Sequence, residues 1–313
     1  MPEWVYEAGI GETRAALIAD GAIVEAAIEY PARLRLGTVV PARLVELTAG
    51  GMGRLDVDGE DAVIARIPPG VTKGATLTVE IVREAIPESG RPKPPRAIAT
   101  AASPAAGPDL LARLHAGDHP VRVLRSHEPD VLEAAGWSEL LEEATSGAIV
   151  FPLGALRMSP TPAMTLFDVD GPPPIDNLAI AAAHAVAVAI RRHAIGGSIG
   201  VDFPTLANKA ARQAVAEAVD AALPQPFERI AVNGFGFLQI VRPRPRASLP
   251  ELLRADPAGA AARATLRRLE REPPGSPLHH RLPPAVHARL TTRPDWLAEL
   301  ARRTGVTHRL DCA

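Results

Sequence analysis

Short apolar runs separated by turn residues dominate the first third of the chain. Residues 3–30 hold alternating apolar segments, and Asp20-Gly21 between two of them is a dipeptide typical of two-residue hairpins. We therefore expect two or three short strands here. From about residue 35 to residue 97, β-rich runs such as TVVPARLVEL and ATLTVEIVREAI are separated by Gly, Pro and Asp. Four or five strands at this spacing indicate a small closed barrel of the OB type, with any other small antiparallel barrel as the alternative.

Beyond a proline-rich linker, strand and helix patterns alternate. Strands are predicted at residues 147–153, 163–169, 198–201, 229–232 and 237–242, with helices at residues 177–193 and 207–223. Strands interleaved with helices are typical of a layered fold built on a sheet. The predicted fold class is α/β (α+β), a mixed-sheet core with a small β-barrel inserted before it.

These patterns divide the chain into five predicted segments. They are N-terminal strands packing on the core at residues 1–34, the barrel at residues 35–97, a linker and helical segment at residues 98–146, the α/β core at residues 147–250 and a helical C-terminal tail at residues 251–313.

Charge and composition limit the classes of partner. The net charge of −2 provides no overall positive field for nucleic acid, so any RNA binding must rest on local patches. No apolar run reaches the roughly 18 residues that span a bilayer, and the first residues lack a basic-then-apolar signal pattern. We expect a cytoplasmic protein with no membrane partner. Cys312 is the only cysteine, so an internal disulfide is excluded and no Cys-based zinc site is expected within one chain.

Acidic residues stand at the ends of two apolar strand patterns. The run AMTLFDVD ends in Asp168 and Asp170, and SIGVDF carries Asp202. Residues i and i+2 of a strand project to the same face, and Asp202 approaches that pair if the two strands are neighbours. Clustered carboxylates repel one another unless a cation neutralises them, and Mg²⁺ is the hard ion that such oxygen ligands favour. The alternative is that each acid simply solvates a loop, and Asp170 heads a turn in which aspartate is common.

Longer stretches around these acids carry a family resemblance. GIGETRAALIADGAIVEAAIEY, TSGAIVFPLGALRMSPTPAMTLFDVDG, DNLAIAAAHAVAVAIRRHAIGGSIGVDF and VNGFGFLQIVRPRPR follow one another through most of the chain. In this order they resemble the ribonuclease E/G family of endoribonucleases, and residues 35–97 are similar to the S1 barrel of that family. The most specific parts are the Asp-Val-Asp block, which resembles the family's Ile-Asp-Ile-Asn motif, and the Gly-Gly and Asp-Phe block.

The resemblance implies an activity and a site. Asp168 and Asp202 fall on the two aspartates that hold the catalytic Mg²⁺ in the family, with Mn²⁺ as an alternative ion. Asp170 falls on the asparagine of the motif and adds a negative charge, which either supports or impairs activity. The implied reaction is hydrolysis of single-stranded RNA to products with 5′-phosphate and 3′-hydroxyl ends.

Two departures from the family change the expectation. Residues 98–146 are short for the family's insertion that senses the RNA 5′ end, so little or no preference for a 5′-monophosphate is expected. The family shares zinc between protomers through a Cys-x-x-Cys pair, which Cys312 alone cannot supply. We therefore expect no zinc and either a monomer or a dimer without a zinc link.

Contacts with RNA are predicted from cationic and aromatic residues. Arg242, Arg244 and Arg246 in VRPRPR are candidate phosphate contacts, because the intervening prolines favour an extended chain; the alternative is a solvated strand exit. Phe203, Phe235 and Phe237 are candidates for stacking on a base, although core packing is the more common fate of phenylalanine. His279, His280 and His287 match no known ligand spacing, so no metal is expected there.

Three functions remain open at this level. The leading hypothesis is a Mg²⁺-dependent endoribonuclease that acts in RNA processing or turnover. The second is a catalytically weak or inactive RNA-binding protein on the same scaffold, and the third is an assembly factor without RNA.

Overall fold

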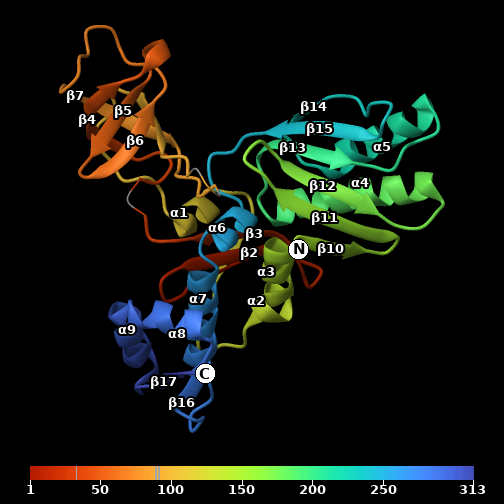
Figure 1. Ribbon diagram of the computed structural model, residues 1–313. Helices are drawn as coiled ribbons and strands as arrows, with labels where there is room; N and C mark the ends of the chain where they lie inside the picture. Colours follow the sequence, from red (N-terminus) through yellow and green to blue (C-terminus); the bar gives the residue numbers. More distant parts are fainter. Residues whose placement is uncertain (33, 89, 91) are drawn as a thin grey trace.

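The computed structural model describes residues 1–32, 34–88, 90 and 92–313. Arg33, at the end of the predicted N-terminal segment, and Ser89 and Arg91, within the predicted barrel segment, lie outside the described residues. The chain forms a β-barrel at one side and a sheet with two helices at the other, with the N-terminal strands between them and the C-terminal elements beyond (Figure 1). The predicted mixed α/β class is observed.

The N-terminal strands form a sheet in the order β3-β2-β1-β9. Its members are β1 (Glu3–Ala8), β2 (Thr13–Ala19), β3 (Ala22–Glu29) and β9 (Val121–Val123). Asp20 and Gly21 both have positive φ between β2 and β3, as a type I′ hairpin turn requires. Strand β9 pairs in parallel with β1, so the segment predicted as linker and helix also contributes to this sheet.

Helices from two distant parts of the chain cover this sheet. One face packs against α2 (Val131–Ala134), α3 (Trp137–Ser146) and α6 (Leu249–Ala255), and the other face packs against α1 (Leu110–His115). Trp137 is the largest fully buried side chain of the first interface. The N-terminal strands therefore share their core mainly with residues 98–146 and with α6.

The barrel closes in the order β4-β5-β6-β8-β7. Its strands are β4 (Val39–Leu47), β5 (Gly53–Val57), β6 (Glu60–Ile64), β7 (Thr76–Arg83) and β8 (Arg96–Ala99), with the 3₁₀ turn η1 (Ala49–Gly51) between β4 and β5. Alternate residues point inward, and Leu44, Leu55, Ile64, Val79 and Ile81 are fully buried. A closed barrel at this place in the chain agrees with the sequence pattern.

The second sheet has the order β10-β11-β12-β13-β15-β14. Its strands are β10 (Ala148–Phe151), β11 (Gly154–Pro160), β12 (Thr165–Asp170), β13 (Gly197–Asp202), β14 (Glu228–Arg229) and β15 (Phe237–Arg242). Only the β12–β13 pairing is parallel among the described strands of this sheet. The strand predicted at residues 147–153 is observed as β10, whereas β11, which follows it after a tight turn, was not predicted.

Two helices cover one face of this sheet. They are α4 (Ile175–Arg192) and α5 (Lys209–Ala222), whose buried residues form one core with the inward-pointing residues of β10 to β15. Val150, Arg157, Asp168 and Asp202 are exposed on the opposite face. The sheet therefore has an apolar covered face and an open face that carries polar groups.

The C-terminal segment contains more than the predicted helices. It contains helices α7 (Pro257–Glu270), α8 (Pro284–Thr291) and α9 (Pro294–Thr304). The strand β16 (His279–Leu282) lies between α7 and α8, and it pairs in parallel with β17 (Arg309–Cys312), which follows α9. The expectation of a purely helical tail was incomplete, because the strand sequences HHRL and RLDC are too short and polar to show a strand period. Among the described residues, none of the helices is both long and apolar enough to cross a membrane.

Candidate functional site

Asp168 and Asp202 lie side by side on the open face of the sheet. The parallel register of β12 and β13 runs from Thr165 with Ile199 to Asp168 with Asp202. In-register residues of neighbouring strands lie about 4.8 Å apart. Both aspartates are exposed while the residues before them, Phe167 and Val201, are buried. The two carboxylates therefore project from adjacent strand ends to the same face.

The local sequence explains this placement. Each strand is an apolar run whose inward residues anchor it against α4 and α5; Asp202 is the last residue of β13, and Asp168 lies two residues before the end of β12. A shift of one residue in either strand would turn the apolar set to solvent, so burial fixes the register. The position of both carboxylates follows from the packing of their neighbours.

Asp170 stands beside this pair rather than within it. It lies two residues after Asp168 on the same face, and its register partner is Ala155 of β11. The β12–β13 ladder ends at Asp202, so Asp170 faces no residue of β13. Oxygens of all three carboxylates do not come within 4.8 Å of one another among the groups of the described residues. Asp168 and Asp202 are thus the candidate ligands, with Asp170 as a neighbouring negative charge.

An arginine and a phenylalanine lie in register with the paired carboxylates, and a second phenylalanine lies on the turn before β15. Arg157 of β11 is in register with Asp168, and Phe237 of β15 is in register with Asp202. Phe235 is 84% exposed on the turn before β15, where the Asn233 carboxamide accepts hydrogen bonds from the Phe235 and Phe237 amides. Phe203 is only 2% exposed and belongs to the core. The open face therefore combines carboxylates with a cation and exposed aromatic surface.

The carboxylate pair fits a hard divalent cation. Within the described part of the chain, neither Asp168 nor Asp202 has a hydrogen bond or an ion pair with another side chain. Two adjacent carboxylates repel unless a cation lies between them, and Mg²⁺ binds to one or two carboxylates while it keeps several waters. Exposure of both groups leaves room for such waters. The donor set suits Mg²⁺ or Mn²⁺.

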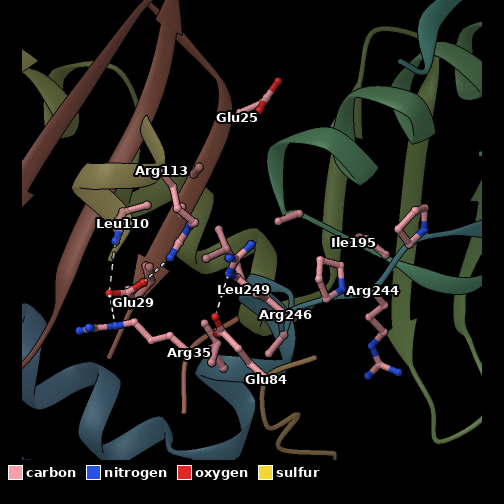
Figure 2. Close-up of a pocket in the computed structure, with 18 of the residues that line it drawn as sticks. Glu25, Glu29, Arg35, Glu84, Leu110, Arg113, Ile195, Arg244, Arg246 and Leu249 are labelled. Atoms are coloured by element: carbon pink, nitrogen blue, oxygen red, sulfur yellow. Dashed lines mark hydrogen bonds and ion pairs between the residues drawn. The ribbon is translucent and has the colours of Figure 1, made fainter. Parts of the chain in front are cut away.

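The arginines predicted to contact RNA line a cavity away from the carboxylate pair. Arg242, Arg244 and Arg246 line a pocket of about 630 Å³ between β3, α1, the end of α4 and the exit from the barrel. Figure 2 shows Arg244 and Arg246 on the segment after β15, with Glu84 beside Arg246 and with Glu29 between Arg35 and Arg113.

Two of these three arginines are engaged within the protein. Arg244 pairs with Glu88 at 2.8 Å and with Glu251, and the Arg246 Nε donates to Glu84 at 3.0 Å. Among the described residues, Arg242 has no such pair, and burial lowers its pKa although Glu25 opposes this effect. Of the three arginines, Arg242 is therefore the one that is available to pair with a phosphate. Such a pair would directly stabilise its partly buried charge.

Arg242 and the carboxylate pair lie at opposite ends of the sheet. Arg242 is in register with Gly197, five residues along β13 from Asp202, or about 17 Å at roughly 3.3 Å per residue. Alternation along β15 also turns Arg242 to the face opposite Phe237. The structure does not bring the predicted RNA-binding arginines to the predicted metal ligands. Arg157, which sequence reasoning missed because arginine is abundant throughout, is the cation beside the carboxylates.

Comparison with known proteins adds no assignment. No protein-family model matches the chain, and a search of curated proteins finds no significant match.

Proposed function

We propose that this chain is a Mg²⁺-dependent endoribonuclease that hydrolyses phosphodiester bonds of single-stranded RNA. The observation that carries the proposal is the parallel register of Asp168 with Asp202, both exposed on one face. The resemblance of the two strand blocks to ribonuclease E/G motifs supports the same residues. The closed barrel, which is similar in sequence to an S1 domain, supports RNA as the substrate class.

The residues of the chain have distinct parts in this reaction. Asp168 and Asp202 hold the ion, and Arg157 beside Asp168 contacts a non-bridging phosphate oxygen. Phe235 and Phe237 stack on bases that flank the cleaved bond. When bound, Mg²⁺ supplies an activated water and neutralises charge that develops on the phosphoryl oxygens. Arg242 lies too far along the sheet, and on its opposite face, to act on the same phosphate.

The alternative is an RNA-binding protein with little or no turnover. The observation in its favour is Asp170, which places a third negative charge next to the ion where the family motif has a neutral asparagine. RNA would then bind to the same aromatic and cationic residues without cleavage.

Cleavage of a labelled single-stranded RNA oligonucleotide separates these functions. The protein is assayed with Mg²⁺, with Mn²⁺ and with EDTA, beside the variants Asp168→Asn and Asp202→Asn. We expect cleavage only with metal, and a loss of at least about 100-fold in each variant, or roughly 2.7 kcal/mol of transition-state stabilisation. Binding of RNA should persist in both variants.

Asp176→Asn is the matched control. Asp176 is an exposed acid in the first turn of α4, outside the carboxylate pair, and its replacement should leave cleavage unchanged. Binding without cleavage under any metal would favour the alternative. A protein that neither binds nor cleaves the RNA would contradict both proposals.

A further inference from the structure

A second group of potential metal ligands lies in the C-terminal segment. Glu272 follows α7, His280 belongs to β16 and His308 immediately precedes β17. One ligand atom from each lies within 4.8 Å of the others, and all three residues are half-buried. Figure 1 shows β16 and β17 side by side near the C-terminus. Residues separated by a long stretch of sequence thus meet at one point.

The parallel strand pair explains how the two histidines meet. His280 is in register with Leu310, and His308 lies two residues before Leu310, so both imidazoles project to the same face. His279 projects to the opposite face, where its Nε2 lies 2.7 Å from Asp311. Only one of the two adjacent histidines of β16 therefore faces Glu272.

The separations of the donor atoms suit a metal. The His280 Nε2 lies 3.1 Å from the His308 Nδ1 and 3.7 Å from the Glu272 Oε2. Ligands bound at 2.0–2.1 Å in a tetrahedral zinc site lie about 3.3 Å from one another. The observed separations lie on either side of this value, so small shifts of the side chains would complete the geometry.

Hydrogen bonds alone leave this cluster unsatisfied. The Glu272 Oε2 is buried and has no hydrogen-bond partner among the described residues, because its 3.7 Å separation from His280 is too long. The other oxygen of Glu272 accepts from Arg268 at 3.0 Å, which orients the carboxylate toward the histidines.

We propose that Glu272, His280 and His308 bind one Zn²⁺-class divalent ion that fastens β16 and β17 to the end of α7. Two imidazoles and one carboxylate form a donor set that suits zinc rather than Mg²⁺. The site borders a pocket of about 730 Å³ that is also lined by His127, Glu128 and Arg303, which leaves room for a water as fourth ligand. The site uses no cysteine, differs from any zinc link between protomers, and does not depend on the proposed ribonuclease activity.

Metal titration of the full chain tests this site. Protein freed of metal with a chelator is titrated with Zn²⁺, and with Co²⁺ as a spectroscopic probe. We expect one equivalent to bind, with visible absorption from four- or five-coordinate Co²⁺ and a rise in the thermal unfolding temperature. His280→Ala and His308→Ala should each weaken binding by at least about 100-fold, since loss of a direct ligand exceeds the effect of losing an outer partner.

Two controls separate the site from adventitious binding. His279→Ala removes the neighbouring imidazole on the opposite face, and Cys312→Ser removes the exposed thiol; both should retain full affinity. Glu272→Gln keeps the size of the side chain and should weaken binding without unfolding, as far-ultraviolet circular dichroism would show. Wild-type affinity in His308→Ala, or no stoichiometric Zn²⁺ binding by the folded wild type, would overturn the proposal.

Discussion

The ring of Phe237 occupies the space that a side chain on Gly200 would need. A Cβ atom at residue 200 would lie 2.7 Å from the Phe237 Cζ and 2.8 Å from the Leu166 Cδ2. Phe237 is also in register with Asp202, two residues along β13 from Gly200. Glycine at this position therefore lets the Phe237 ring pack over the backbone of residue 200, beside the carboxylate pair.

A side chain at residue 200 should displace this ring. Gly200→Val is expected to lower the free energy of unfolding by about 1–3 kcal/mol, as overpacking does, and to reduce RNA cleavage further than stability explains. Urea unfolding and cleavage rates measure the two effects. Gly234→Val is the matched control, because a Cβ atom there meets nothing within 4 Å. Equal cleavage rates in Gly200→Val and Gly234→Val would show that Phe237 takes no part in RNA binding.

Phe235 offers an exposed ring for stacking on a base. Phe235→Ala should weaken binding of single-stranded RNA by about 1–3 kcal/mol, the usual value for one stacked base, and leave stability unchanged. Fluorescence anisotropy with a labelled oligonucleotide measures the affinity. Val150→Ala, at a side chain that is 83% exposed on the edge strand β10, is the control. An unchanged affinity in Phe235→Ala would place the RNA elsewhere.

Asp170 should influence the ion through its charge alone. The unit charge of Asp170 about 6 Å from a divalent ion contributes roughly 1.4 kcal/mol in water, so Asp170→Asn should raise the Mg²⁺ concentration for half-maximal cleavage about tenfold. A Mg²⁺ titration of the cleavage rate measures this change. Faster cleavage at saturating Mg²⁺ would instead identify Asp170 as a residue that impairs the reaction.

Arg14 should be essential for stability. Its side chain is 1% exposed and pairs with Glu7 at 2.5 Å and with Asp130 at 2.7 Å. Arg14→Ala removes one of the two guanidinium partners of Glu7 and Asp130, leaves them only Arg271, and should cost about 3–5 kcal/mol. Arg122→Ala, which breaks an exposed pair with Glu128, should cost no more than about 1 kcal/mol. Denaturant unfolding compares the two, and similar losses would contradict the role of Arg14.

His193 should make stability depend on pH below neutrality. Burial lowers its pKa despite the hydrogen bond to Glu143, so the unfolded chain takes up a proton more readily than the folded one. This contribution to stability is present above the ordinary histidine pKa of 6.5 and is lost as the pH falls toward the folded value. For a single buried histidine, we expect the loss to be on the order of 1 kcal/mol.

Unfolding in urea at pH 7.5 and pH 5.5 measures this dependence. His193→Gln should show a smaller loss of stability between the two pH values than the wild type. His184→Gln removes an exposed histidine of the same helix and should retain the wild-type loss. The same pH dependence in all three proteins would exclude His193 as the source.

Local patterns of residues determined much of the architecture. Asp20-Gly21 specified a hairpin because few other residue pairs adopt positive φ twice. The short β-rich runs between residues 35 and 97 indicated a closed barrel, and the range predicted for β15 coincides with Phe237–Arg242. The aspartates at the ends of two apolar strands were recognisable as candidates because alternation and burial are properties of neighbouring residues.

Only the tertiary structure decided which groups meet. The parallel register of β12 with β13 places Asp168 beside Asp202, while β15 carries Arg242 to the other end of the sheet. Glu84 and Glu88, far away in sequence, engage two of the three arginines that looked free. The β16–β17 pairing brings His308 to His280. Such contacts depend on strand order and long-range packing, which the periodicity of a single segment does not encode.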